Sequence, residues 1–170
     1  MHQLSDDLQR AVEAGYAARD RRDMAPTIDY FERLLADHPG HPVLVFHAAG
    51  AYDTAGREEE AAAMYERALA LGLDGVELRQ CLCQYGSTLR WLGRLDESIK
   101  VLERARREFP ASDAVRVFLA LSLADADRTD AAVAQLLTVI TDHPEVTDLG
   151  RYAVGLAGLA TWLADGRPAE

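Results

Sequence analysis

Small and bulky apolar residues follow one another along the chain in a pattern that occurs four times. The copies are marked by Pro39, Leu73, Pro110 and Pro144, which are spaced by 34, 37 and 34 residues. Within each copy, apolar positions recur at intervals of three and four residues, which is the spacing of one face of an α-helix. A repeat of about 34 residues indicates a stack of helix–turn–helix pairs.

The four copies agree column by column when they are placed in register. A close-packing column in the first helix of each pair holds Gly15, Ala49, Gly86 and Ala120. In the second helix a small column holds Thr27, Ala61, Ser98 and Ala132, and a bulky column four residues later holds Phe31, Tyr65, Leu102 and Leu136. Small residues let two helices approach closely, and bulky residues fill the space between neighbouring pairs.

The pattern predicts helices throughout, because alanine and leucine abound and runs of β-branched residues are scarce. We expect them near 5–20, 24–37, 42–55, 58–71, 75–92, 95–108, 112–125, 129–142 and 146–164. The predicted caps are Ser5, Asp23 and Ser112, and Pro42 suits a first helical turn.

Tight turns between paired helices are expected at glycine, which tolerates left-handed backbone. Gly56 and Gly93 occupy that position, and Asp127 replaces glycine in the fourth copy. The extra residues at 71–75 lengthen the junction between the second and third copies.

These columns resemble the Leu-Gly, Tyr, Ala, Phe and Pro pattern of the tetratricopeptide-repeat family, from about Leu8 to Pro144. The chain departs from the family pattern at the tryptophan position, which holds Ala11, Val45, Leu82 and Arg116, and in the second copy, which lacks the proline. Residues 86–94, GSTLRWLGR, are similar to a bacterial subfamily with a GSTLR-x-LGR segment and no established activity.

The resemblance implies an all-α fold, a right-handed superhelical array of four helix–turn–helix units closed by a C-terminal capping helix. We expect a single domain over residues 1–170, with repeats at about 8–41, 42–78, 79–112 and 113–145 and the capping helix at about 146–164.

The net charge of −10 argues against nucleic-acid binding, because an acidic surface repels phosphate backbones. No apolar run is long enough to span a bilayer, and the N-terminus does not resemble a signal peptide. Cys81 and Cys83 are two positions apart on one helix and do not suit a disulfide, which favours a reducing, cytoplasmic setting. Lys100 is the only lysine beside many arginines, as is typical of GC-rich bacterial genomes.

Residues that could support catalysis or metal binding are better explained by structure. His38 and His41 flank a proline turn and lack the geometry of a helical zinc pair. Glu58 to Glu60 suit the positive end of a helix dipole. Cys83 and His47 lack an identifiable third catalytic group. We therefore predict no enzyme activity, no cofactor and no metal.

In the tetratricopeptide-repeat family the first helix of each pair lines a concave groove that binds a peptide. Carried onto this chain, the resemblance predicts groove residues at Tyr16, Arg19, Phe46, His47, Asp53, Gln84, Ser87, Arg90 and Phe118. Aromatic rings with a few orienting polar groups are what a peptide site needs. Arg90 would orient an acidic group of the ligand or pair with Asp53. The alternative, that Phe46, Trp91 and Phe118 fill the core, stays open.

The family's chaperone-binding members use a lysine–asparagine clamp, and the matching first-copy positions here are Val12 and Tyr16, so that activity is not expected. We predict a non-enzymatic module that binds a protein or peptide partner. The alternative is self-assembly as a homodimer through the C-terminal helix, with contacts at Gly155, Gly158 and Trp162.

Overall fold

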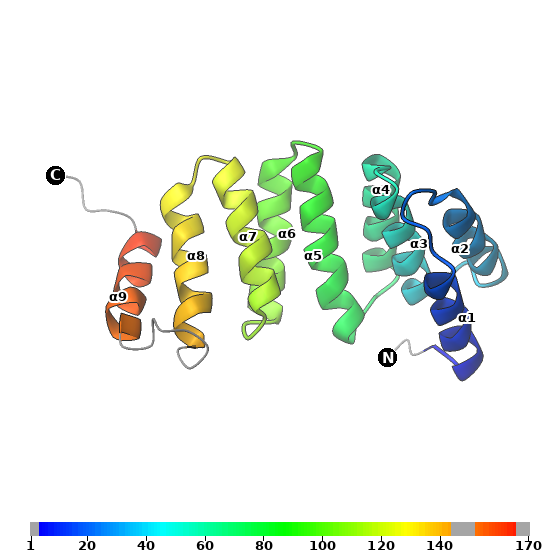
Figure 1. Cartoon of the computed structure of the whole chain (residues 1–170), viewed down its shortest axis with the longest axis horizontal. Helices are drawn as coiled ribbons and strands as arrows, with labels where there is room; N and C mark the ends of the chain where they lie inside the picture. Colours follow the sequence, from blue (N-terminus) through cyan, green and yellow to red (C-terminus); the bar gives the residue numbers. More distant parts are fainter. Residues whose placement is uncertain (1–3, 144–151, 166–170) are drawn as a thin grey trace. The chain divides into compact units, whose positions relative to one another are not determined.

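The computed structural model describes residues 4–143 and 152–165, and the regular structure there is helical. The helices are α1 (Asp6–Ala17), α2 (Ala25–Asp37), α3 (Pro42–Thr54), α4 (Glu58–Ala70), α5 (Gly75–Trp91), α6 (Leu95–Glu108), α7 (Asp113–Asp125), α8 (Thr129–Asp142) and α9 (Ala153–Ala164) (Figure 1). Within these ranges the only β pairing is an isolated bridge between Asp20 and Asp23. The all-α prediction is confirmed.

The first eight helices begin and end within three residues of their predicted bounds. The ninth is predicted from residue 146, but residues 146–151 lie outside the described part of the chain, where α9 begins at Ala153. Ser5 and Ser112 cap α1 and α7 as expected, since their hydroxyls accept from the backbone N–H of Leu8 and Val115. The prediction for Asp23 is wrong by one residue: α2 is capped by Met24, and Asp23 accepts from the Ala25 N–H at 3.2 Å.

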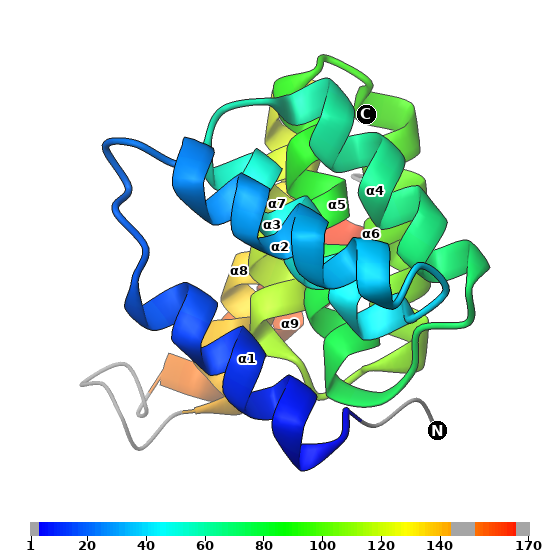
Figure 2. The same ribbon diagram turned by 90° about the vertical axis from the view of Figure 1, so that its right-hand side faces the viewer.

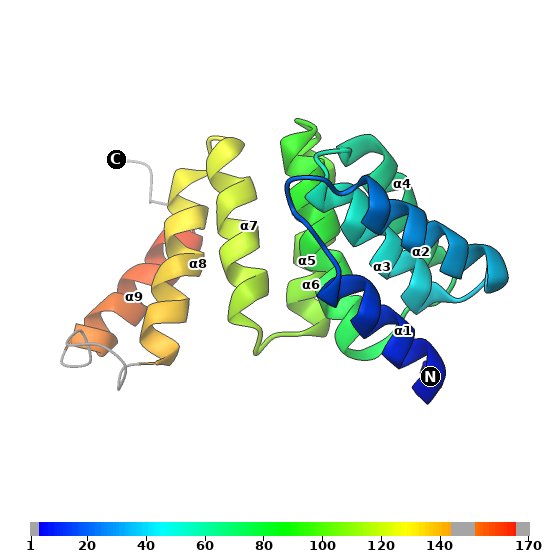
Figure 3. The ribbon, with the colours of Figure 1, turned by 45° about the vertical axis from the view of Figure 1, so that its right-hand side comes forward.

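The chain divides into two compact units, residues 1–92 with α1 to α5 and residues 93–170 with α6 to α9. In the first unit α3 packs against α2 and α4, and α4 packs against α5. Figure 2 looks onto α2 and α4 of this unit, with α3 behind them. In the second unit α7 packs against α6 and α8, and α8 packs against α9 (Figure 3). Within each unit, helices that are consecutive in the chain are therefore neighbours in space.

The predicted turn residues have the backbone that the sequence indicated. Gly56 and Gly93 have φ values of 71° and 72°, and Asp127, which replaces glycine in the fourth copy, has a φ of 57°. Aspartate tolerates this left-handed conformation better than most residues, so the substitution preserves the turn.

The small columns are buried at every copy, and the bulky column is buried at Phe31, Tyr65 and Leu102. Leu136, the fourth member of the bulky column, departs from the pattern because 42% of it is exposed. In the second unit Ile99, Leu102, Leu119 and Leu123 form the core. Ser98 and Ser122 are also buried, and their hydroxyls hydrogen-bond to each other at 2.8 Å. Each hydroxyl therefore has a hydrogen-bond partner inside the protein.

Gly15 shows why the close-packing column holds small residues. A Cβ added to this glycine would lie 2.8 Å from the Tyr30 ring and 3.0 Å from the Phe31 ring. Tyr30 in turn donates its hydroxyl proton to the carbonyl of Ala11 at 2.8 Å, which fixes its ring against α1. Contact between α1 and α2 therefore depends on the absence of a side chain at position 15.

We predict that Gly15→Ala lowers the free energy of unfolding by about 1–3 kcal/mol, because the added methyl group overpacks the contact with Tyr30 and Phe31. This loss would outweigh the gain of about 1 kcal/mol that alanine brings to a helix interior. Urea denaturation followed by circular dichroism measures the difference.

Gly50→Ala is the matched control for the Gly15 variant, since a Cβ at Gly50 would meet no atom closer than 3.8 Å. This control is expected to keep or raise the stability. Equal stability changes in the two variants would show that helix propensity, and not contact with Tyr30, decides the effect at Gly15.

Candidate functional site

The predicted groove residues are divided between the two units. Tyr16, Arg19, Phe46, His47, Asp53, Gln84, Ser87 and Arg90 belong to the first unit, and Phe118 belongs to the second. In the first unit they lie on α1, α3 and α5 or, for Arg19, just after α1. We call the side chains that these helices bring together the A-helix face, after the first helix of each pair.

Tyr16 and His47 join α1 to α3 on the A-helix face. The Tyr16 hydroxyl lies 2.9 Å from His47 Nδ1, and the two rings meet edge to face at 5.5 Å. The guanidinium of Arg19 lies 5.4 Å from the centre of the Tyr16 ring. Burial raises the pKa of Tyr16 and lowers the pKa of His47 to about 4. Both groups are therefore uncharged near neutral pH, and the imidazole can accept the tyrosine proton at Nδ1.

Asp53 links α3 to α4 and α5 through two neutral hydroxyl groups. Thr88 donates to Asp53 Oδ1 at 3.0 Å, and the Tyr65 hydroxyl lies 3.3 Å from Oδ2. The same Tyr65 hydroxyl is 2.9 Å from Gln84 Oε1. Burial is the main cause that raises the pKa of Asp53, although the two hydrogen bonds oppose this shift. The carboxylate is therefore held in a place where its charge is poorly solvated.

Gly50 lies one helical turn before Asp53, where these polar groups converge. The position that its Cβ would take is 3.8 Å from the Tyr16 hydroxyl and 4.0 Å from both the Tyr65 hydroxyl and Gln84 Oε1. Polar atoms from α1, α4 and α5 thus surround one point on α3. A hydrogen-bonding group of a ligand could reach several of them at once.

The aromatic residues of the prediction differ in their placement. Phe46 is only 4% exposed and packs against His47 at 5.1 Å and Tyr65 at 6.3 Å, so it supports the polar groups from within. Phe118 is half-buried and packs against the core of the second unit. Both rings therefore pack in or against the core, as the alternative interpretation of the sequence expects. Trp91 is the opposite case, being 70% exposed with the Arg90 guanidinium 5.0 Å from its ring centre.

Tyr65 and Thr88 are functional candidates that the sequence prediction missed. Tyr65 was assigned to the bulky packing column, where its ring is indeed buried. The signal was its hydroxyl, because a buried tyrosine at a position that otherwise takes phenylalanine or leucine needs a polar partner. Ser87 and Arg90, which were predicted, are half-buried on α5 beside Thr88 in the chain.

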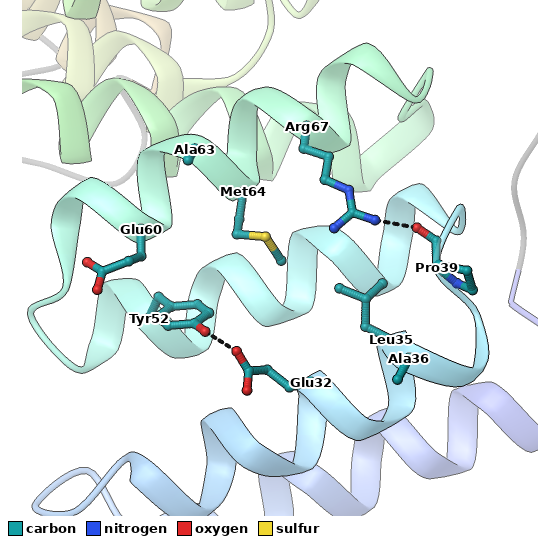
Figure 4. A pocket seen from close by; sticks show the side chains of 9 residues that line it. All are labelled: Glu32, Leu35, Ala36, Pro39, Tyr52, Glu60, Ala63, Met64 and Arg67. Carbon is teal, nitrogen blue, oxygen red and sulfur yellow. Dashed lines mark hydrogen bonds between the residues drawn. The ribbon is translucent and has the colours of Figure 1, made fainter.

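The structure also contains a groove that the sequence did not indicate. It has a volume of about 550 Å³ and lies between α2 and α4, the second helices of their pairs. Figure 4 shows Glu60 and Tyr52 toward one end, Glu32 and Met64 near the middle, and Leu35 with Arg67 and Pro39 toward the other end. The Tyr52 hydroxyl donates to Glu32, and Arg67 donates to the carbonyl of Pro39. Its polar rim is thus partly satisfied by the protein itself.

The predicted homodimer contacts lie on α9, a helix without a charged residue. A Cβ at Gly155 or Gly158 would meet no atom within 4 Å, so both glycines face open space. Val154 is 91% exposed, and Trp162, Leu159 and Tyr152 are also exposed. An apolar surface of this kind on a helix is typical of an interaction surface.

Within the described ranges, no three histidine, cysteine, aspartate or glutamate side chains are grouped so that they could hold a metal ion. In the same part of the chain, no helix combines the length and the apolar character needed to cross a membrane.

Comparisons with known proteins agree on the architecture. Residues 42–158 match the family model described as "Tetratrico peptide repeat". A solved structure described as "MamA RS-1 ArsTM double mutant" has a TM-score of 0.67 and 12% sequence identity, covering 99% of this chain and 100% of that one. At this identity the likeness shows the fold alone. No curated protein matches the chain.

We predict that His47 makes the first unit less stable in mild acid. Its pKa is lower in the folded protein, about 4, than the ordinary value of 6.5, so the unfolded chain binds the proton first as the pH falls. The free energy of unfolding should therefore drop by up to about 2 kcal/mol between pH 7 and pH 5. Urea denaturation at each pH measures the change.

His47→Gln is the control for this pH effect, because its amide oxygen can still accept from Tyr16 and does not titrate. The variant should lose clearly less stability than the natural chain over the same pH interval. Parallel pH profiles for the two proteins would contradict the assignment to His47.

Proposed function

The chain belongs to the tetratricopeptide-repeat family, and on that premise we propose that it is a non-enzymatic interaction module that binds a peptide segment on the A-helix face. In this proposal the side chains that α1, α3 and α5 place on this face contact the partner. The partner is a protein or peptide, and the setting is the cytoplasm of a bacterium.

The observation that carries the proposal is the convergence of Tyr16, His47, Asp53 and Gln84 from three different helices. Their contacts join residues that are far apart in the sequence, since Tyr16 and His47 are separated by 31 positions and Asp53 and Thr88 by 35. Half-buried polar groups beside large rings offer contact area together with orientation, as peptide sites require. In this proposal Ser87 and Arg90, which also lie on α5, contact the partner as well.

A second candidate function is self-assembly, which the exposed apolar surface of α9 favours. Two copies of a chain with a charge of −10 repel each other over most of their surfaces. The helix that carries Val154 and Trp162 has no charged residue, so it adds nothing to this repulsion. In this alternative Gly155 and Gly158 let the partner helix approach closely.

We predict that peptides selected for binding to this chain depend on Gln84. Random twelve-residue peptides displayed on phage are selected on the immobilised protein, and their dissociation constants are measured by fluorescence anisotropy. Gln84→Ala should weaken binding about tenfold, because one polar contact in a desolvated site is lost. Arg90→Ala should also weaken binding, because in this proposal its guanidinium orients an acidic group of the ligand.

The control variants for this selection change residues of α4 that are not part of the A-helix face. Glu59→Gln changes an exposed residue of α4 and should leave binding intact. Met64→Gln alters the groove between α2 and α4. Peptides that bind Gln84→Ala and Arg90→Ala like the natural chain, but lose affinity for Met64→Gln, would place the site in that groove and refute the A-helix face.

For the alternative, we predict that Trp162→Asp abolishes any self-association, because a buried carboxylate in an apolar interface is strongly unfavourable. Light scattering or sedimentation velocity at increasing concentrations measures the oligomeric state. A natural chain that stays monomeric at high concentration would remove this function, and a dimer that persists in the variant would move the interface away from α9.

A further inference from the structure

Gly50 is a glycine whose presence the fold itself does not explain. It lies in the middle of α3, where glycine is less favourable than alanine by about 1 kcal/mol. Its φ is not among the positive values of this chain, and a Cβ there would make ordinary contacts at 3.8–4.0 Å. Gly15 is different, because α2 would collide with any side chain at that position. The absent side chain at Gly50 leaves an opening.

The atoms around this opening are hydrogen-bonding oxygens from three other helices. They are the Tyr16 hydroxyl of α1, the Tyr65 hydroxyl of α4 and Gln84 Oε1 of α5. Tyr65 has one proton for two acceptors, Gln84 Oε1 at 2.9 Å and Asp53 Oδ2 at 3.3 Å. Two acceptors of the cluster therefore share one tyrosine proton. A ligand that donates protons would complete it.

The charge of the cluster also favours a ligand that donates protons. The hydrogen-bond partners of Asp53 are the hydroxyls of Thr88 and Tyr65, which carry no charge that could compensate the carboxylate. Burial raises the pKa of Asp53, so its ionised form gains from a nearby cation. An anionic ligand group would instead face this carboxylate and the Gln84 carbonyl oxygen at close range.

We propose that the opening at Gly50 receives the ammonium group of a lysine side chain from the bound peptide. An ammonium carries three donors on a slim stem, which suits acceptors that converge from Asp53, Gln84 and the tyrosine hydroxyls. A guanidinium is planar and wider, and a neutral amide lacks the charge that the carboxylate favours. This inference rests on the proposed function, because it assigns one side chain of a peptide on the A-helix face.

The test uses synthetic pools of random twelve-residue peptides in which one central position is fixed as lysine, arginine, glutamine, leucine or glutamate. Capture of each pool by the immobilised full chain is compared. The lysine pool should be captured about tenfold better than the glutamine pool, as expected for a charge-assisted contact. The arginine pool should fall between the two.

Gly50→Ala is the decisive variant, because it fills the opening and leaves the net charge of the chain unchanged. It should abolish the preference for lysine while the stability stays the same or rises, so that unfolding cannot account for the loss. Asp53→Asn should abolish the preference as well. Glu59→Gln removes one negative charge at an exposed position of α4 and should keep the preference, which separates the site from general attraction to an acidic protein.

The outcomes distinguish this inference from the proposed function. Capture without a lysine preference, an equal preference for arginine, or a lysine preference that survives Gly50→Ala would each overturn the ammonium site and leave peptide binding intact. If no pool is captured above the background of an empty surface, peptide binding fails and the ammonium site fails with it.

Discussion

The close contact between a small residue on one helix and a bulky residue on its neighbour is the interaction on which this structure depends. A single amphipathic helix pair cannot bury its apolar face alone, so each pair must stack on the next. Gly15 against Tyr30 and Phe31 shows how little room the contact leaves. Phe31 then reaches the Tyr16 and His47 rings, and Tyr65 reaches Tyr85. The same bulky side chains that close one pair therefore also contact the helix of the next.

This stacking explains why the polar contacts of the candidate site join residues one repeat apart. Asp53 and Thr88 are separated by 35 positions and Tyr16 and His47 by 31, close to the spacing of the copies themselves. In the first unit α3 and α5, the first helices of successive pairs, contact each other, so residues at similar phases of the repeat meet there. Phe46 and Tyr65 hold this arrangement from inside, since both rings are buried against His47 or against each other.

The sequence predicted the helices and their turns well because those features are local. Capping by Ser5, the left-handed backbone of Gly56 and the tolerance of Asp127 at a glycine position depend on neighbours within a few residues. The phase of the repeat also placed Tyr16, His47 and Gln84 on the first helices of their pairs, where the structure has them. It could not show that the Tyr65 hydroxyl turns toward Asp53 or that a groove lies between α2 and α4, because these features depend on side-chain packing between helices. Leu136 is a further example. Its position in the repeat predicted a buried side chain, but burial also depends on which residues pack over it.

Two residues that lower the stability of the fold, Gly50 and Asp53, lie one helical turn apart in the first unit. Their proximity favours a functional explanation. A helical glycine at position 50 lowers helix propensity, and the half-buried carboxylate of Asp53 is hydrogen-bonded but not neutralised. Alanine at the first position would meet only ordinary contacts, and an uncharged asparagine at the second could keep the bond to Thr88. Sequences usually agree with their fold at every level, and disagreements concentrate at sites that bind or react. Gly50 leaves the polar atoms around it uncovered, and the Asp53 carboxylate adds a negative charge to them. Together the two residues would suit a ligand better than either would alone.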